Sequence, residues 1–491
     1  MIGLIFRAAL IVVLIVGLYG AYKPLPPGLD LAGPEHELSN SSIHFYRDVT
    51  YTNSEGMRQS DQQIFDEIFR MIDGAQEYLL LDMFFYSDFL GTGTSSYRQL
   101  ARELTDKLVA KKQQNPGVTI QVITDPINTM YGGFEPEHFA RLKESNISVI
   151  VTDLRPLRDT NPLYSAFWRT FFRWIPDELP GHVFPNPLDM SKPKVPIQAY
   201  FDSFNFKANH RKVVVADYQQ GDKVGIATLV TSANPHDGSS AHTNTAIKVD
   251  EYIWRDAIES ERATAAFSHV TLAMPSENLI ARTNASTDIH IDSEETIKTQ
   301  FLTERAVERK IIEQIDTLKK DDSLDMAMFY LSDRHIVREL EHADQRGVAI
   351  RLLLDANKDA FGREKNGIPN RQVAHELLTD SAGTTQVRWC DTHGEQCHSK
   401  ILIFKHGETH SMIQGSANLT SRNLDNLTLE SDIFIAGSAS TTAIADARRY
   451  FETAWNNDGN NYSLDYAAYA DTSVFKTVWY RIGEFTGMSR Y

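Results

Sequence analysis

Two short segments of the sequence each combine a histidine, a lysine two residues later, and a turn that ends in serine, alanine and asparagine. The first segment supplies His210, Lys212, Ser232 and Asn234, and the second supplies His398, Lys400, Ser416 and Asn418. Alternate side chains of a β-strand share one face, so each histidine is expected beside its lysine. A single H-x-K pair on a strand would indicate no more than two exposed surface side chains. Two pairs, each followed by the same S-A-N turn, indicate a functional site.

These residue types suit the cleavage of a phosphodiester. The reaction needs a nucleophile, an acid for the leaving oxygen, and cations for the phosphoryl oxygens. Two imidazoles can act as nucleophile and acid near neutral pH. Lys212 and Lys400 can hold the phosphate as point charges. Asn234 and Asn418 can donate hydrogen bonds to it.

A zinc site is the rival interpretation of a chain with 16 histidines. No H-E-x-x-H segment occurs, however, and an H-x-K segment places a repelling ammonium group beside the candidate ligand. Two such ammonium groups at one site would repel a divalent metal ion. We therefore expect no metal and no other cofactor.

The elements that must position these motifs also occur twice. An apolar run over residues 78–88, YLLLDMFFYSD, resembles SLDMAMFYLSD over residues 323–333. Each run follows a stretch with the apolar spacing of a helix and precedes another helix and a second strand. These second strands end at Asp125 and Asp355. The pattern predicts an α/β fold with two duplicated α/β/α sandwich units, each a mixed sheet flanked by helices, related by a pseudo-twofold axis.

Together the motifs resemble the phospholipase D superfamily, whose signature is H-x-K-x4-D followed by a Gly/Ser-x-Asn element, present twice in one chain. His210, Lys212 and Asp217 fit the full signature, and His398 and Lys400 fit its second copy. The resemblance implies a phosphodiester-cleaving enzyme that works through a covalent phosphohistidine intermediate. It also implies that Ser232 and Ser416 bind substrate, which the family motif places beside the asparagines.

The sequence departs from the family pattern at two positions. Lys405 stands where the second copy should have its aspartate, and Thr231 stands where glycine is usual. The first departure leaves His398 with less support from a neighbouring carboxylate. The resemblance covers roughly residues 45–455, and it is specific for the superfamily without naming the substrate.

The resemblance also points to carboxylates that orient the histidines. Glu430, twelve residues beyond Asn418, stands where the family often has one; the alternative is a solvated glutamate at a strand end. Its counterpart in the first copy, near Lys248, is not acidic. Asp217 could orient His398, or it could pair with a neighbouring basic side chain.

We assign His210 as the nucleophile, because its motif is intact and Asp217 is available to hold the imidazole tautomer. His398 would then protonate the leaving oxygen and later deprotonate the incoming water or alcohol. The reverse assignment stays open.

The N-terminal residues predict a membrane segment. Residues 1–22 contain Arg7 as their only charged side chain, and as a helix they would rise about 33 Å, enough for a hydrocarbon core of about 30 Å. We expect a single-pass transmembrane anchor with the catalytic body on the extracytoplasmic side; a cleaved signal peptide is the alternative. The expected organisation is a linker over residues 23–44, a first unit over 45–275 and a second unit over 276–491.

The first unit carries an insertion over residues 154–205 that is rich in proline and aromatic residues. On a helix, Leu163, Phe167 and Trp174 would share one apolar stripe. Such a helix suits a bilayer interface, and the alternative is a lid or core-packing helix. A similar stretch covers residues 474–485.

The net charge of this 491-residue chain limits the classes of binding partner that we expect. It has 49 Lys and Arg against 65 Asp and Glu, a net charge of −16. Proteins that neutralise nucleic-acid phosphates usually present a basic face, so we expect no nucleic-acid partner. With the anchor and the apolar helices, the charge favours a phospholipid membrane as partner and glycerophospholipids as substrates, for hydrolysis or for phosphatidyl transfer as in cardiolipin synthases. A membrane-tethered nuclease and an inactive binding protein are the alternatives, and we expect a monomer with an internal pseudo-dimer.

Cys390 and Cys397 are the only cysteines. If the body is extracytoplasmic, a disulfide between them would close a short loop and hold the approach to His398. Two free thiols are the alternative.

Overall fold

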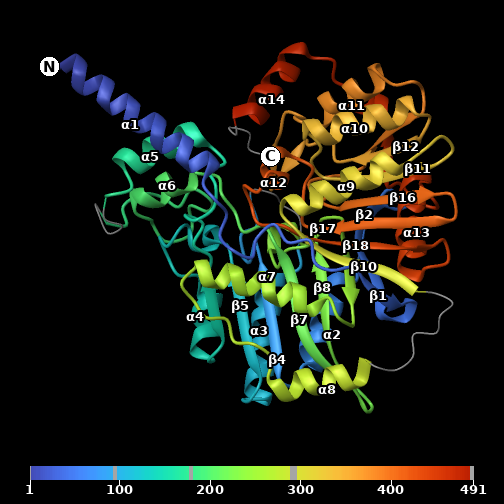
Figure 1. The fold of residues 1–491 in the computed structure, drawn as a ribbon, viewed down its shortest axis with the longest axis horizontal. Helices are drawn as coiled ribbons and strands as arrows, with labels where there is room; N and C mark the ends of the chain where they lie inside the picture. Colours follow the sequence, from blue (N-terminus) through green and yellow to red (C-terminus); the bar gives the residue numbers. More distant parts are fainter. Residues whose placement is uncertain (1, 92–96, 176–180, 288–295, 487–491) are drawn as a thin grey trace.

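The computed structural model describes residues 2–91, 97–175, 181–287 and 296–486. Figure 1 shows two large sheets with helices on their faces. The first sheet has the strand order β3-β2-β9-β8-β7-β4-β5-β6, and the second has the order β1-β10-β18-β17-β16-β11-β12-β15-β19. Strands β4, β5 and β6 are parallel, whereas β7 is antiparallel to β4, so the first sheet is mixed.

The strands of the first sheet are β2 (Ile43–Thr52), β3 (Arg58–Gln62), β4 (Tyr78–Met83), β5 (Thr119–Thr124), β6 (Ser148–Val151), β7 (Lys212–Gln220), β8 (Lys223–Thr231) and β9 (Asn244–Val249). Those of the second are β1 (His36–Ser39), β10 (Thr296–Thr303), β11 (Ser323–Met328), β12 (Ala349–Leu354), β15 (Thr385–Cys390), β16 (Lys400–His406), β17 (Thr409–Gly415), β18 (Ser431–Ser438) and β19 (Ser463–Asp465). A short hairpin joins β13 (Asp359–Ala360) and β14 (Arg363–Glu364).

The two sheets repeat one another in register. Met83 of β4 is paired with Lys212 of β7, and Met328 of β11 is paired with Lys400 of β16. Both central strands are buried on both faces, which explains their continuous apolar sequences. The predicted mixed α/β fold with two large helix-flanked sheets is confirmed.

Amphipathic helices cover the sheets. They are α2 (Ile64–Gly74), α3 (Leu100–Gln114), α4 (Glu137–Glu144), α7 (Trp254–Phe267), α9 (Arg305–Thr317), α10 (Arg334–Gln345), α11 (Asn370–Thr379) and α13 (Thr442–Asn456). Ile64, Ile68 and Ile72 of α2 are fully buried, as their spacing predicts. One hydrophobic core also joins the two sheets, because Ile247 of β9 lies in the same cluster as Ile433 of β18.

Two expected boundaries differ from the structure. Residues 23–44, expected to be a linker, contribute β1, which pairs with β10 in the second sheet. The added strand satisfies backbone groups that β10 would otherwise leave open at the sheet edge. Helix α8 (Glu277–Thr287) lies beyond the expected boundary at residue 276, yet it contacts β8 of the first sheet.

The N-terminal residues form helix α1 (Ile2–Tyr22), but the expected transmembrane anchor is not supported. Within the described ranges, no helix is both long and apolar enough to cross a membrane. The C-terminal part of α1 packs against α5 (Pro162–Phe171) of the insertion (Figure 1). A Cβ on Gly17 would lie 3.2 Å from the Cβ of Ala166, so glycine permits this close approach.

Candidate active site

Each motif histidine lies where the chain enters one sheet and contacts the other unit. His210 precedes β7, and its backbone N–H donates to the carbonyl of Leu429 at 2.9 Å. His398 precedes β16, and its backbone N–H donates to the carbonyl of Thr243 at 2.8 Å. Leu429 precedes β18 of the second sheet and Thr243 precedes β9 of the first. This exchange brings both histidines to the junction of the units.

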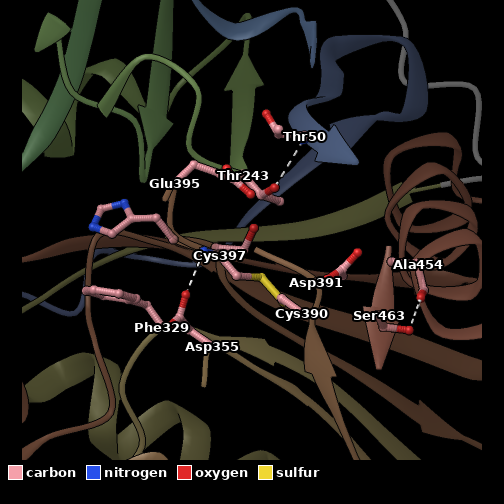
Figure 2. The surroundings of a disulfide bond; sticks show 12 residues. Thr50, Thr243, Phe329, Asp355, Cys390, Asp391, Glu395, Cys397, Ala454 and Ser463 are labelled. Atoms are coloured by element: carbon pink, nitrogen blue, oxygen red, sulfur yellow. Dashed lines mark hydrogen bonds between the residues drawn. A yellow bond between two sulfur atoms is a disulfide. The ribbon is translucent and has the colours of Figure 1, made fainter. Parts of the chain in front are cut away.

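Aspartates at the ends of two equivalent strands fix the chain just before each histidine. Asp125 follows β5, and its Oδ2 accepts the backbone N–H of Asn209 at 2.7 Å. Asp355 follows β12, and its Oδ2 accepts the backbone N–H of Cys397 at 2.8 Å (Figure 2). Burial raises the pKa of Asp125 to about 7, although its backbone donors oppose the shift. The aspartates therefore position both motif segments.

The two cysteines form a disulfide, so this expectation is confirmed (Figure 2). The bond joins the end of β15 to Cys397, the residue before His398. Because Cys397 also donates to Asp355, a covalent bond and a hydrogen bond together fix the segment that carries His398.

Glu430 is the partner of His210. The imidazole Nδ1 lies 2.9 Å from Glu430 Oε2 and 3.0 Å from Oε1. Ser416 Oγ donates to Oε2 at 2.5 Å and Thr428 Oγ1 donates to Oε1 at 3.1 Å, while Asn423 also donates to Oε1. Burial alone would raise the pKa of Glu430, but His210 and then other neighbours outweigh it and lower the pKa to about 2. The buried carboxylate is therefore ionised at neutral pH.

His398 has an amide partner instead. Its Nδ1 lies 3.0 Å from Oδ1 of Asn244, and Ser232 Oγ donates to the same oxygen at 2.9 Å. Asn244 begins β9, as Glu430 precedes β18. The two histidines thus have equivalent surroundings with one chemical difference, a neutral amide in place of a carboxylate.

This geometry refines one prediction and corrects another. The counterpart of Glu430 is Asn244, which is not acidic, as expected, and lies four residues before Lys248, because the first unit reaches its strand two residues sooner after the S-A-N turn. Ser232 and Ser416 were expected to bind substrate, but their hydroxyls donate to Asn244 and Glu430. Both serines therefore position the groups that orient the histidines.

The two lysines follow equivalent paths. Lys212 Nζ donates to the carbonyl of its motif histidine at 2.5 Å and lies 4.9 Å from the ring centre of Phe84. Lys400 Nζ donates to the carbonyl of its own motif histidine at 2.7 Å and lies 5.0 Å from the ring centre of Phe329. Each ammonium group lies over an aromatic face, which favours its position.

The motif side chains lie close enough together for the charge of one to shift the pKa of another, as Lys400 does for His210 and Lys212 does for His398. Burial lowers the pKa of Lys212 to about 7, although Glu430 opposes the shift. Burial and then Lys212 hold the pKa of Lys400 well below its usual range. Burial lowers the pKa of His210 to about 4, and burial followed by Lys400 holds the pKa of His398 well below its usual range. A phosphate anion bound here would favour the charged lysines.

Asn234 and Asn418 lie at the turns after β8 and β17, as the motifs predict. Asn234 Oδ1 accepts the backbone N–H of Phe85 at 3.2 Å. Asn418 is buried, and its Oδ1 has no hydrogen-bond partner among the described residues. A buried polar atom without a partner is typical of a group that meets a ligand or water.

Asp217 does not lie at the site. Its carboxylate accepts three backbone N–H groups at the start of β4, from Gln76 at 3.0 Å, Glu77 at 3.0 Å and Tyr78 at 2.8 Å. It is five residues beyond Lys212 along β7, a separation of about 16 Å in a strand. The prediction that Asp217 orients a histidine is wrong, because its carboxylate holds a neighbouring strand end instead.

Metal-ligating geometry occurs away from the motifs. Within the part of the chain that the structure describes, the group that could hold a metal ion is Glu308, Asp333 and His335. It contains none of the motif residues. At the motifs, two ammonium groups at one site disfavour a cation.

A family model matches part of the second unit. Residues 311–455 match the model described as cardiolipin synthase, PLD-like domain. This stretch contains the second motif and Glu430, and the first unit repeats its arrangement. Residues 311–455 are therefore similar to the phospholipase D superfamily. The resemblance drawn from the motifs is confirmed.

One solved structure supports the fold, and two others are similar at lower TM-scores. Phosphatidylserine synthase from Haemophilus influenzae has a TM-score of 0.55 at 10% identity, over 92% of this chain and 94% of that one. Polyphosphate kinase from Porphyromonas gingivalis has a TM-score of 0.41 at 12% identity, over 91% and 53%. Nuc from Salmonella typhimurium, a phospholipase D family member, has a TM-score of 0.26 at 16% identity, over 34% and 97%. A search of curated proteins finds no match.

The candidate site also contains residues that the H-x-K and S-A-N motifs did not reveal. Asn244 could have been found by aligning the strands after the two S-A-N turns. Asp125 and Asp355 end matched apolar runs, and Phe84 and Phe329 occupy matched positions one residue beyond their strands. Equivalent positions in the repeat were therefore the available signal for all five residues.

Proposed function

We propose that this chain is a phospholipase D superfamily member that cleaves phosphodiesters of glycerophospholipids, by hydrolysis or by phosphatidyl transfer, through a phosphohistidine intermediate. The observation that carries the proposal is the exchange of orienting groups across the unit junction: Glu430 meets His210, and Asn244 meets His398. With both motif lysines beside them, two imidazoles can act on one phosphate. The family model that matches the second unit supports lipid chemistry.

In this proposal His210 is the nucleophile. Glu430 accepts its Nδ1–H, so Nε2 carries the lone pair that attacks phosphorus. As the P–N bond forms, the P–O bond to the leaving alcohol breaks, and His398 gives its proton to that oxygen. His398 then takes a proton from water or an alcohol, whose oxygen attacks phosphorus and breaks the P–N bond.

The difference between the two partners favours this assignment. An ionised Glu430 stabilises the positive charge that develops on the imidazole of a phosphohistidine. Asn244 is neutral, so it does not retain the proton on His398, which must give a proton away in the first step. A bound phosphodiester anion favours the protonated form of His398 before that step.

A lipid surface is the proposed partner, and exposed apolar side chains support it. Leu163 of α5 and Trp174 just beyond it are 75% and 74% exposed, so this stripe is not core. Phe475 and Trp479 of α14 (Val474–Thr486) are 76% and 60% exposed. The C-terminal end of α1 and the start of α5 line one groove together with α14, where Arg481 and Phe485 lie beside acidic side chains such as Glu484. Aromatic and arginine side chains suit a bilayer interface.

The disulfide supports an extracytoplasmic catalytic body, because disulfides persist mainly in oxidising compartments. We propose this location together with contact at the membrane surface. Thiol labelling of intact cells against lysed cells would check it, with an engineered surface cysteine as the probe.

Incubating the purified chain with mixed phospholipid vesicles, with and without glycerol, tests the function. We expect new lipid products by mass spectrometry, with phosphatidic acid indicating hydrolysis and phosphatidylglycerol indicating transfer. His210→Ala should abolish both. Cleavage of single-stranded DNA or RNA without any lipid product would contradict the lipid proposal and favour the nuclease alternative.

A further inference from the structure

A third histidine lies beside the motif pair. His242 precedes β9 by two residues and is only 2% exposed. The centre of its ring lies 5.9 Å from that of His398. The second unit has Thr428 at the equivalent position, two residues before Glu430, where its hydroxyl donates to that carboxylate. The histidine is therefore specific to the half of the site that contains His398.

A backbone hydrogen bond fixes the proton of this imidazole. The N–H of Gln396 donates to Nδ1 of His242 at 3.2 Å. A ring nitrogen that accepts a hydrogen bond carries no proton, so the neutral ring has its proton on Nε2. Burial and then Lys400 lower the pKa of His242 to about 3, which keeps the ring neutral at physiological pH. His242 is thus a fixed, uncharged N–H donor.

The donor has nothing in the described protein to bind. His242 Nε2 is buried and has no hydrogen-bond partner among the described residues. Leaving a buried N–H without an acceptor is costly, and native proteins rarely do so unless a ligand or water meets it. Lys400, the charged group that acts most on His242, is also the group that holds phosphate in the proposed reaction.

We propose that Nε2–H of His242 donates a hydrogen bond to a non-bridging oxygen of the bound phosphodiester, beside Lys400. The inference rests on the proposed function, and it gives the site one more catalytic residue. His242 would stabilise charge on the phosphoryl oxygens without itself gaining or losing a proton. His398 alone would then exchange a proton in that half of the site.

Two substitutions separate this role from a structural one. His242→Phe keeps a ring of similar shape but removes both nitrogens. His242→Gln also removes the ring acceptor for Gln396, yet its amide can still donate near the position of Nε2. A difference in activity or phosphate affinity between the two variants therefore measures the effect of the N–H donor. Thermal unfolding of each variant checks that both are folded.

The kinetic test uses bis(4-nitrophenyl) phosphate and diphenyl phosphate, which has the poorer leaving group. His242→Phe should lower kcat about 10²-fold on both, as expected for one lost donor to a developing oxyanion. His242→Gln should keep most of the activity. His398→Ala should instead lose much more with diphenyl phosphate, because only His398 assists the leaving group.

A binding test with inorganic phosphate does not depend on turnover. Isothermal titration should show phosphate affinity reduced about 5- to 10-fold in His242→Phe and nearly unchanged in His242→Gln. Three results would overturn the inference. They are equal losses of kcat or phosphate affinity in both variants, unchanged kcat and affinity in His242→Phe, and a loss of kcat confined to the substrate with the poorer leaving group. A wild-type chain that cleaves neither diester would contradict the proposed function, while selective loss of phosphate affinity would still support the role of His242.

Discussion

The carboxylate of Glu430 belongs to the second unit, yet it sets the proton of His210 in the first. Four groups bind it, namely Ser416, Asn423, Thr428 and the imidazole itself. Asn244 has the equivalent position beside His398 but carries no charge. At the scale of residues, this single difference separates a histidine that accumulates positive charge from one that exchanges a proton.

Glu430→Gln should lower kcat on the order of 10²–10⁴-fold, because an amide can present the wrong hydrogen-bonding group to His210 and cannot stabilise its positive form. Steady-state rates on bis(4-nitrophenyl) phosphate measure this effect. The matched control is Asp217→Asn, which should keep kcat and lose stability, since that carboxylate binds backbone N–H groups elsewhere. Near-normal turnover in Glu430→Gln would refute its orienting role.

Glu430 should also make stability depend on pH. Its pKa is about 2 in the folded chain against an ordinary value of 4.5, so the unfolded chain binds this proton more readily. The stabilisation is therefore complete above about pH 4.5 and declines as the pH falls toward 2. Urea midpoints between about pH 5 and 3 should fall more steeply for the wild type than for Glu430→Gln. Parallel curves would contradict the expectation.

At the scale of elements, apolar runs and helical spacing were enough to place β4, β5, β11 and β12, because strands buried on both faces read as continuous apolar segments. The motif histidines and lysines were also found from the sequence. The sequence could not place β1, whose role depends on pairing with β10 far along the chain. Asp217 was misplaced for a similar reason, since its partners lie on another strand.

The disulfide links two elements near the site, the end of β15 and the entry to β16. Its seven-residue separation gives an expected contribution of about 2.5 kcal/mol from restriction of the unfolded chain. The Cys390→Ala/Cys397→Ala variant should lose about that much free energy of unfolding in urea. A reductant should remove the difference from the wild type. Two reactive thiols in the denatured, unreduced wild type would contradict the bond.

At the scale of the whole molecule, a buried ion pair joins the units behind the site. Arg211 donates to Glu304 Oε1 at 2.6 Å, and the same oxygen accepts the backbone N–H of Glu430 at 3.2 Å. Arg211 is fully buried in the first unit, and Glu304 directly precedes α9 of the second. The ion pair therefore connects the segment of one histidine with the residue that orients it.

Glu304→Gln should destabilise the chain by about 3–5 kcal/mol, because it leaves the Arg211 guanidinium without its closest buried carboxylate. Urea unfolding measures the loss. Replacing both partners, as Arg211→Met/Glu304→Met, should recover part of it, since the buried guanidinium is then removed; the recovery is only partial because Glu261, 3.4 Å from Arg211, also loses its partner. A double variant no more stable than Glu304→Gln would show that the ion pair is not the cause.

The most direct test of one site shared by two units is to trap the covalent intermediate. The His398→Ala variant is mixed with bis(4-nitrophenyl) phosphate, whose leaving group needs little acid assistance, then quenched and digested for mass spectrometry. We predict a 4-nitrophenyl phosphoryl group on His210, and none when His210→Ala is treated in the same way. An adduct on His398 of the wild type with none on His210, or full turnover by either variant, would contradict the assignment.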